Sequence, residues 1–186
     1  MKVVAIVGSP RATGNTSVLV DRALEVIFDA GIETEKILLG LKRIHPCQGH
    51  DDCHSIASCH LHDDINDIMD KFLKADGIIF ACPTYFLNVS AQMKIFIDRF
   101  RHPYRKNIKS TASQAGVISV AARNGADTVA DMLKSFLERA TNIKPEEMLS
   151  VYGCARNIGD ATGNIDLMEQ AGKLGRDMAQ KLKQSA

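Results

Sequence analysis

The beginning of the chain joins a short apolar strand to a helix through a loop of hydroxyl and glycine residues. Residues 2–7 (KVVAIV) carry a single charge and are rich in β-branched side chains, which is typical of a strand buried on both faces. From Leu19 onward, apolar residues recur at helical spacing until Gly31. Free backbone N–H groups and the positive end of the helix dipole meet at such a junction. The pattern therefore predicts an anion site, and we expect a phosphate there.

The composition of this loop narrows the kind of phosphate. Residues 8–17 read GSPRATGNTS, without the Gly-x-x-x-x-Gly-Lys-Ser/Thr pattern for nucleoside triphosphates or the Gly-x-Gly-x-x-Gly pattern for dinucleotides. The hydroxyls, one amide and one arginine suit a terminal monophosphate held by many neutral donors. The alternative is a helix capped by Asn15 or Thr16 with no ligand at all.

A second strand–loop–helix unit follows later in the chain. Residues 75–82 (ADGIIFAC) predict another buried strand, and the polar and aromatic loop PTYFLNVS comes directly after it. Ser90 is expected to cap a helix over residues 91–100. In an open α/β sheet, ligands bind at the carboxyl ends of the strands where the strand order reverses, so we expect both loops to line one crevice.

These two segments resemble those of a known family. GSPRATGNTS at residues 8–17 and PTYFLNVSAQMKIFIDR at residues 83–99 look like the motifs of NADPH-dependent FMN reductases and iron–sulfur flavoproteins, in the flavodoxin-like superfamily. The resemblance runs from Met1 to about Arg101 and is weak beyond. It implies FMN, with its phosphate in the first loop and its ring edge against the second.

The resemblance also implies individual FMN-binding residues in three loops. The third loop follows a strand over residues 114–121, and Arg123 and Asn124 depart there from the small, glycine-rich loop usual in relatives. Arg11 and Arg123 are candidates for a positive group near the flavin N1. The candidates are Ser9, Arg11, Asn15, Thr16 and Ser17 for the phosphate, Pro83, Thr84, Tyr85, Phe86 and Asn88 for the ring, and Ala122, Arg123 and Asn124 in the third loop.

The remaining pattern completes an α/β fold. Further strands are expected at residues 33–39, 114–121 and 148–152, and further helices at 65–73, 129–140 and 165–182. Alternating strands and helices predict parallel strands with right-handed crossovers. We expect a single domain over residues 1–186: a flavodoxin-like three-layer sandwich with a five-stranded parallel sheet in the order 2-1-3-4-5, and a cysteine- and histidine-rich loop inserted after the second strand.

That loop, residues 45–62, concentrates soft metal ligands. It holds five of the six histidines and three of the five cysteines of the chain. In iron–sulfur flavoproteins this place carries four cysteines that ligate a 4Fe-4S cluster; here Cys47, Cys53 and Cys59 match the first, third and fourth, and His50 stands at the second. A Cys₃His set is equally suited to zinc, and a surface loop without metal is the third interpretation.

Composition limits the partners. The formal charge of +1 is scattered, which argues against a nucleic-acid surface, and no apolar stretch is long enough to cross a membrane. A strand rather than a signal sequence at the N-terminus and an odd number of thiols predict a cytoplasmic protein, with Cys82 and Cys154 as packed thiols. The basic run at residues 99–109 is expected to be a solvated loop, the alternatives being docking of an acidic ferredoxin or of the NADPH phosphate.

The function that we expect is that of an FMN-dependent oxidoreductase. Electrons would come from NAD(P)H or a ferredoxin-like donor and pass to a small molecule or a protein, with no side chain needed as an acid or a base. The alternatives are a noncatalytic flavodoxin-like electron carrier and a metal-sensing binding protein on the same scaffold. Near-neutral charge argues against a flavodoxin. The resemblance also implies a homodimer or homotetramer.

Overall fold

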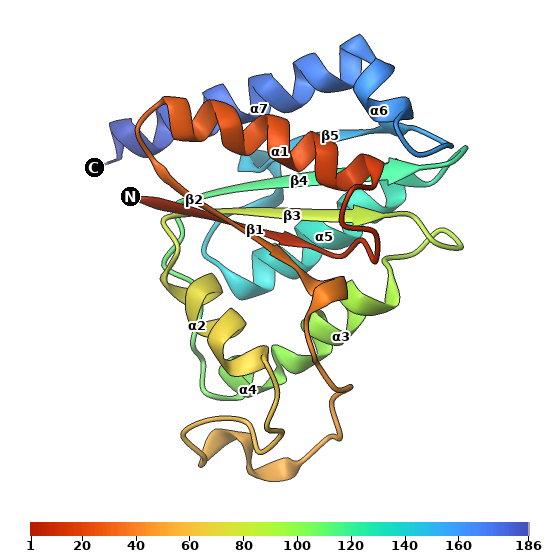
Figure 1. The fold of residues 1–186 in the computed structure, drawn as a ribbon. Coiled ribbons are helices and arrows are strands. Elements are labelled where there is room, and N and C mark those ends of the chain that lie inside the picture. Colours follow the sequence, from red (N-terminus) through yellow and green to blue (C-terminus); the bar gives the residue numbers. More distant parts are fainter. Residues whose placement is uncertain (186) are drawn as a thin grey trace.

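A parallel sheet forms the middle layer of the computed structural model, which describes residues 1–185 (Figure 1). Its five strands lie in the order β2-β1-β3-β4-β5, and all neighbours are parallel. The predicted fold class and strand order are therefore confirmed. The strands are β1 (Lys2–Val7), β2 (Glu33–Leu38), β3 (Gly77–Pro83), β4 (Gln114–Ala121) and β5 (Leu149–Cys154).

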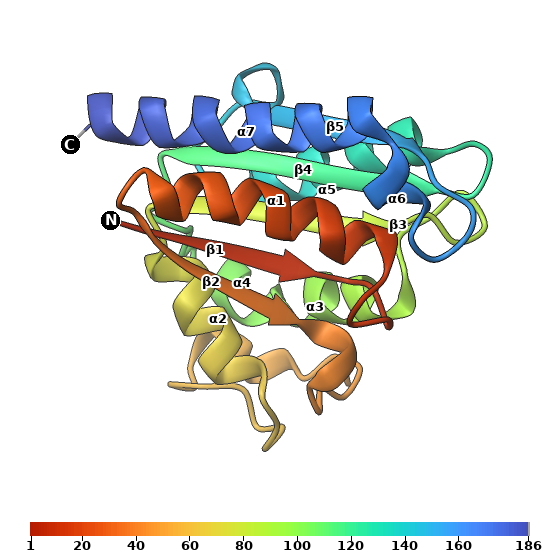
Figure 2. The same cartoon turned by 45° about the horizontal axis from the view of Figure 1, so that its top comes forward.

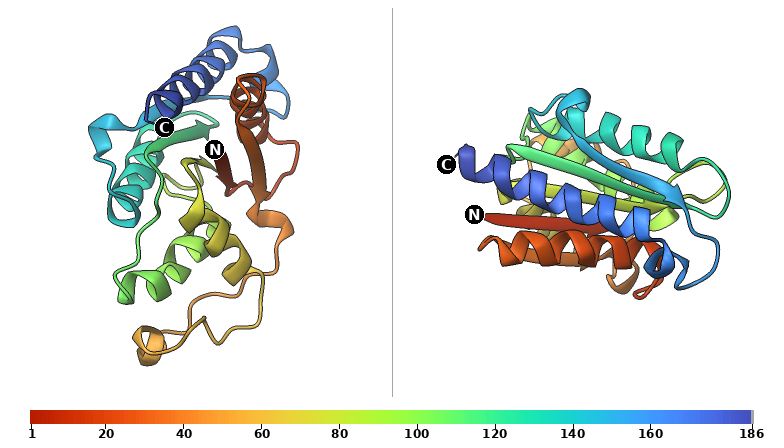
Figure 3. Two further views of the ribbon diagram at one scale, coloured as in Figure 1. Left: turned by 90° about the vertical axis from the view of Figure 1, so that its left-hand side faces the viewer. Right: turned by 90° about the horizontal axis from the view of Figure 1, so that it is seen from above.

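Helices cover both faces of the sheet, as Figure 2 and the two views of Figure 3 show. One face is covered by α1 (Asn15–Asp29) and α7 (Ile165–Gln184), and the other by α2 (Ile65–Lys74), α3 (Ala91–Arg99) and α5 (Ala126–Ala140). The short elements are α4 (Arg101–Arg105), α6 (Asp160–Gly163) and the 3₁₀ turns η1 (Leu39–Leu41), η2 (Asp51–His54) and η3 (Pro145–Glu147).

The central strands are buried on both faces because their side chains are apolar on both. Val3 to Val7 are fully buried, with alternate residues entering the two cores. Apart from Lys2 at the start of β1, the charged residues of the strands all lie on β2, which is at an edge of the sheet. This contrast is expected of a doubly covered parallel sheet, where a charge on a central strand has no route to water.

An aromatic cluster fills the core beneath α2, α3 and α5. The rings of Phe72, Phe80, Phe96, Phe100 and Phe136 lie 5.3–6.4 Å from their neighbours, mostly in tilted or edge-to-face arrangements. Each such pair adds about 0.5–1.5 kcal/mol beyond the burial of its area. The cluster fixes α3, whose two ends carry the loop after β3 and the residue Arg99.

The long C-terminal helix packs directly on α1. A Cβ at Gly175 would lie 2.5 Å from the carbonyl oxygen of Ala23, so only glycine permits this approach of the two helices. The apolar stripe of α7 is buried and its opposite face is charged. Of the helices in residues 1–185, none combines the length and the apolar character that a membrane span requires.

Several predicted boundaries shift, for local reasons. Helix α5 begins at Ala126, three residues earlier than predicted, because Gly125 takes a left-handed conformation (φ 86°) and turns the chain into the helix. Strand β5 runs on to Cys154. The prediction of a solvated loop at residues 99–109 was wrong in part: Arg99 is buried and residues 101–105 form α4.

Candidate functional site

Three loops meet at the carboxyl edge of the sheet, after β1, β3 and β4 (Figure 2). Strands β1 and β3 are neighbours, but the chain proceeds from β1 outward to β2 on one side and from β3 outward to β4 and β5 on the other. The strand order therefore reverses between the first two loops, which is where open α/β sheets bind their ligands.

The loop after β1 presents unpaired backbone donors at the start of α1. The N–H groups of Asn15, Thr16 and Ser17 have no hydrogen-bond partner within residues 1–185, and the first turn carries no acidic residue. Thr16 and Ser17 are buried, and Gly14 precedes the helix without any side-chain cap. The interpretation of a helix capped by Asn15 or Thr16 was wrong. The free donors and the helix dipole suit an anion instead.

The side chain of Asn15 has a different task from the one predicted. Its Nδ2 donates to the carbonyl oxygens of Ala155 (3.2 Å) and Asn157 (2.7 Å), and its Oδ1 accepts from the N–H groups of Gly159 and Ala161, both at 3.2 Å. These four bonds occupy both N–H donors and both acceptor sites of the Asn15 side-chain amide. Only the backbone N–H of Asn15 is left for an anion, and the side chain instead ties the loop to the segment after β5.

The hydroxyl groups of the first loop are also partly engaged. The Ser9 Oγ accepts the N–H of Arg11 at 3.1 Å and shapes the turn, while Arg11 itself is exposed. The Ser17 Oγ accepts from the Lys36 Nζ at 3.2 Å, which leaves its O–H free to donate. Lys36, on β2, was not predicted as a neighbour of this loop. Its charge is shared with Asp21, 2.5 Å from the same Nζ.

The loop after β3 is a tight turn of unusual conformation. Tyr85 and Asn88 exchange backbone hydrogen bonds of 2.9 and 3.0 Å, and between them Phe86 (φ 52°) and Leu87 (φ 59°) are both left-handed. Left-handed backbone costs roughly 1–2 kcal/mol for each residue with a Cβ, and strain of this kind collects at functional sites. The Phe86 side chain is fully exposed, and those of Tyr85 and Leu87 are about half exposed. Pro83 and Thr84 lead into the turn at intermediate exposure.

A single buried serine joins the first two loops. Ser90 caps α3 as predicted, accepting the N–H of Met93 at 3.2 Å, and its hydroxyl donates to the carbonyl oxygen of Gly8 at 2.6 Å. The Cys82 Sγ accepts the N–H of Ser90, and burial raises the pKa of this thiol even though the bonds from Ser90 oppose the rise. A Cβ at Gly8 would lie 2.7 Å from that of Met93, so this close contact requires glycine.

The loop after β4 is tied to both of its neighbours. The Thr84 hydroxyl donates to the carbonyl oxygen of Gly125 at 3.2 Å, and the Cys154 Sγ donates to that of Arg123 at 2.8 Å. Cys82 is buried as predicted, but Cys154 is exposed rather than packed. The predicted residues of this loop, Ala122, Arg123 and Asn124, are all exposed.

The four predicted metal ligands do not form one coordination set. Within residues 1–185, no three His, Cys, Asp or Glu side chains are grouped so that they could hold a metal ion. Cys53 is buried and its Sγ donates to the carbonyl oxygen of His50 at 3.3 Å, whereas the Cys59 Sγ accepts from Arg99 at 3.3 Å. Cys47 lines a separate groove with Phe136. In this arrangement the thiols of Cys53 and Cys59 bond to different partners rather than to one shared ion.

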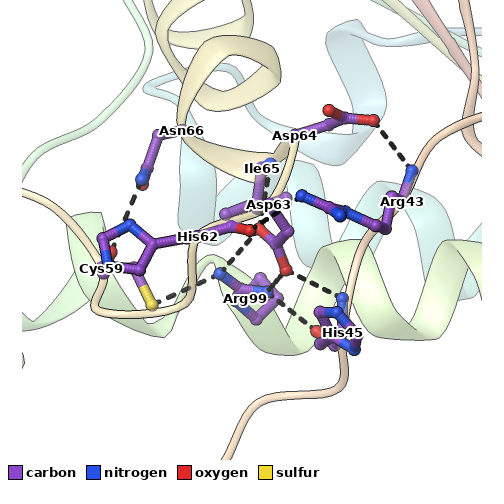
Figure 4. A network of polar contacts seen from close by, with 9 residues as sticks. All are labelled: Arg43, His45, Cys59, His62, Asp63, Asp64, Ile65, Asn66 and Arg99. Carbon is purple, nitrogen blue, oxygen red and sulfur yellow. Dashed lines mark hydrogen bonds and ion pairs between the residues drawn. The ribbon is translucent and has the colours of Figure 1, made fainter.

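A buried ion pair helps to hold this segment to the rest of the fold (Figure 4). The Arg99 guanidinium bonds both oxygens of Asp63, at 2.6 and 3.2 Å, and the carbonyl oxygen of His45 at 2.8 Å. The two side chains are 1% and 0% exposed. Burial disfavours the charged carboxylate, but Arg99 and the N–H groups of His45 and Ile65 outweigh it and hold the pKa of Asp63 below its ordinary value.

Comparison with known proteins agrees with the geometry of the three loops. Residues 1–151 match the model of the NADPH-dependent FMN reductase family. The chain belongs to this family. The resemblance inferred from residues 8–17 and 83–99 is thereby confirmed. The FMN reductase fold accounts for all of the sheet except the end of β5.

Two relatives extend the match over nearly the whole chain of this FMN reductase family member. An iron–sulfur flavoprotein of Methanocaldococcus jannaschii is 37% identical over 98% of both chains. Another, of Archaeoglobus fulgidus, is 35% identical over 97% of this chain and 80% of its own. Among solved structures, an NAD(P)H:quinone oxidoreductase from Methanothermobacter marburgensis has a TM-score of 0.74 over 96% of both chains at 16% identity, which supports the fold.

Proposed function

We propose that this chain is an FMN-dependent oxidoreductase that takes electrons from NAD(P)H and passes them to a small-molecule or protein acceptor. The observation that carries the proposal is the pairing of two loops at the reversal of strand order. One loop offers free backbone donors at a helix N-terminus, the other is a strained, exposed turn, and Ser90 joins them by its bond to Gly8. Family membership supports FMN as the ligand of this pair.

Different loops hold the phosphate and the ring of FMN. The N–H groups of residues 15–17 and the hydroxyls of Thr16 and Ser17 bind the phosphate, each charge-assisted bond contributing roughly 1.5–3 kcal/mol. The turn at Tyr85 to Asn88 receives the ring edge. When bound, FMN supplies a ring that accepts a hydride and releases electrons. The contribution of the protein is to position the ring, orient the donor and limit the access of water.

Anaerobic reduction tests this function directly. Protein loaded with FMN is mixed with stoichiometric NADPH, and in parallel with NADH, while the flavin absorption is followed. We expect at least one nicotinamide to bleach the flavin and an added quinone to restore the colour. If FMN stays bound but neither nicotinamide reduces it, the reductase proposal fails, and the alternatives of a ferredoxin-fed enzyme or an electron carrier take its place.

A metal in the cysteine–histidine window (residues 45–62) is a second proposal, and it rests on different support. The supporting observations are the soft ligands Cys47, His50, Cys53 and Cys59 and the names of the full-length relatives. Because the side chains are not grouped around a common point, we assign no electron-transfer step to a cluster. Iron, sulfide and zinc analysis of protein purified without oxygen decides among a 4Fe-4S cluster, zinc and no metal.

Self-association is the third part of the proposal. Phe86 and Leu87 expose apolar side chains at the tip of the loop after β3 (residues 84–89, the ring loop), beside the place proposed for FMN. A homodimer or homotetramer that covers this tip would shield the flavin from water. Sedimentation over a range of concentrations tests it, and a monomer at all concentrations would exclude it.

A further inference from the structure

A basic groove lies between α3–α4 and the end of α5, away from the three loops at the carboxyl edge of the sheet, and Cys47 and Gly49 of the cysteine–histidine window also line it. Its apolar floor includes Phe100, Tyr104 and Phe136, its rim carries Arg105 and Arg139, and its volume is about 570 Å³. Helix α5 separates the two places. Its N-terminus, at Gly125, touches the ring loop, and Arg139 lies in its last turn. At 1.5 Å per residue, about 20 Å of helix lies between them.

Aromatic residues form the floor of the basic groove, with Phe100 almost fully buried (4% exposed) and Phe136 only partly buried. Phe100 and Phe136 stand edge to face, with ring centres 5.3 Å apart, and belong to the aromatic cluster of the core. Tyr104 on α4 is 56% exposed and borders the groove. Rings held rigidly by a packed core lose little side-chain freedom when a planar ligand lies against them, and they favour offset or edge-to-face contacts with it.

The rim of the basic groove carries positive charge without compensation. Within residues 1–185, neither Arg105 nor Arg139 has a carboxylate within 4.0 Å. Arg101 reaches only Asp51, at 3.5 Å, and that carboxylate is 99% exposed. Asp98, which also lines the groove, is already paired with Lys94 at 2.5 Å. Like charges held together in a hollow attract anions, and guanidinium groups suit carboxylate, sulfonate or phosphate oxygens.

The groove also has room beyond its floor. A neighbouring hollow of about 350 Å³ shares Tyr104, Arg105 and Arg139 with it and is also lined by Lys109. An aromatic ring can therefore occupy the first hollow while a charged substituent lies between the arginines. An aromatic floor beside a few convergent cations suits a small molecule that has an aromatic part and an acidic part.

We propose that the basic groove is a second binding site of this protein, for a small planar aromatic anion. The ring lies against Phe100, Tyr104 and Phe136, and the acidic group is held by Arg105 and Arg139. Because the site is separate from the loops after β1, β3 and β4, the proposal does not depend on the assignment of FMN. It gives a function to Arg105, which belongs to the basic run at residues 99–109.

Calorimetry with naphthyl phosphate as the probe tests the proposal. The protein is first loaded with one equivalent of FMN and freed of excess, so that the loop after β1 is occupied before the probe is added. We expect saturable binding that weakens with added salt, and much weaker binding of naphthol and of inorganic phosphate, which lack the charge and the ring respectively. No saturable binding, or equal binding of naphthol, would overturn the proposal.

Matched variants locate the probe. Arg105→Gln and Arg139→Gln each remove one exposed guanidinium and should weaken binding roughly five- to tenfold. Arg176→Gln removes the same charge from an exposed position on α7, in the opposite layer, and should leave binding unchanged. Equal affinity in all three variants would overturn the proposal. A changed sedimentation coefficient in the two groove variants would also overturn it, because the groove would then be a contact between copies of the chain.

Discussion

The Ser90 hydroxyl donates a 2.6 Å hydrogen bond to the carbonyl oxygen of Gly8, and this bond joins the loops that follow β1 and β3. Both residues are buried, and the same oxygen caps α3. The two halves of the proposed FMN site are therefore positioned by one side chain that touches no ligand.

Replacing this serine should loosen both loops. Ser90→Ala leaves the Gly8 carbonyl and the Met93 N–H without their partner, and we expect a loss of about 2 kcal/mol in the free energy of unfolding, with weaker FMN binding. Ser119→Ala is the matched control, because the Ser119 hydroxyl is fully buried but has no hydrogen-bond partner in the described structure. Urea unfolding and FMN titration measure both effects. Equal losses in the two variants would contradict the role given to Ser90.

A negative charge in the first loop should expel FMN. At about 4 Å, and with an effective dielectric constant of about 20, an Asp at position 16 repels a phosphate charge by about 4 kcal/mol. Thr16→Asp should thus bind FMN roughly a thousandfold more weakly. Gln180→Glu adds the same charge on the exposed face of α7 and serves as the control. Thr16→Val, which keeps the shape and removes the hydroxyl, should show a smaller loss. Undiminished flavin in Thr16→Asp would exclude this loop as the phosphate site.

The left-handed backbone at Leu87 should lower the stability of the protein whether or not a ligand is bound. Leu87→Gly removes the side chain and relieves the backbone at φ 59°, whereas Leu87→Ala removes nearly the same side chain but keeps the strain. We expect the glycine variant to be more stable than the alanine variant by about 1 kcal/mol in thermal or urea unfolding. Equal stability of the two would mean that the turn relaxes in solution.

Breaking the buried ion pair should cost far more than breaking an exposed one. Asp63→Asn leaves the Arg99 guanidinium buried without a counter-charge, which typically costs about 3–5 kcal/mol. Asp98→Asn breaks the exposed pair with Lys94 and should cost less than about 0.5 kcal/mol. The two unfolding curves provide the comparison. A small loss in Asp63→Asn would show that the pair is open to water.

The same carboxylate should contribute to acid stability. Because its pKa is lowered in the folded protein, its contribution is present at pH values above the unfolded pKa of about 3.9 and disappears as the pH falls through the folded value. The stability difference between wild type and Asp63→Asn should therefore shrink below about pH 4. Unfolding measured from neutral pH downward would contradict this if the difference stayed constant.

Much of the fold could be predicted because its signals are local. The strands β1, β3 and β4 are continuous apolar runs, and the Ser90 cap stands directly before an apolar helical stripe. Strand order then follows from right-handed crossovers between parallel strands. Once the strands are known to be parallel, the loops that follow β1, β3 and β4 must all lie at the carboxyl edge of the sheet.

The missed features depend on contacts between distant residues. The Asn15 side chain bonds to residues about 140 positions later, and Arg99 finds Asp63 36 positions away. Contacts between such distant residues produce no pattern in the sequence. From the sequence alone, Asn15 was therefore expected to bind phosphate and Arg99 to be solvated. In the cysteine–histidine window, side-chain directions follow from this ion pair and from the turn at residues 51–54 rather than from ligand spacing.

The flavin content of the purified protein decides whether the loops after β1 and β3 bind FMN. Protein purified without oxygen is examined by visible absorption, and the released cofactor is identified by chromatography. We expect stoichiometric FMN with the two bands of an oxidised flavin, and tight uptake of added FMN by any cofactor-free fraction. A colourless protein that also fails to bind added FMN would contradict it.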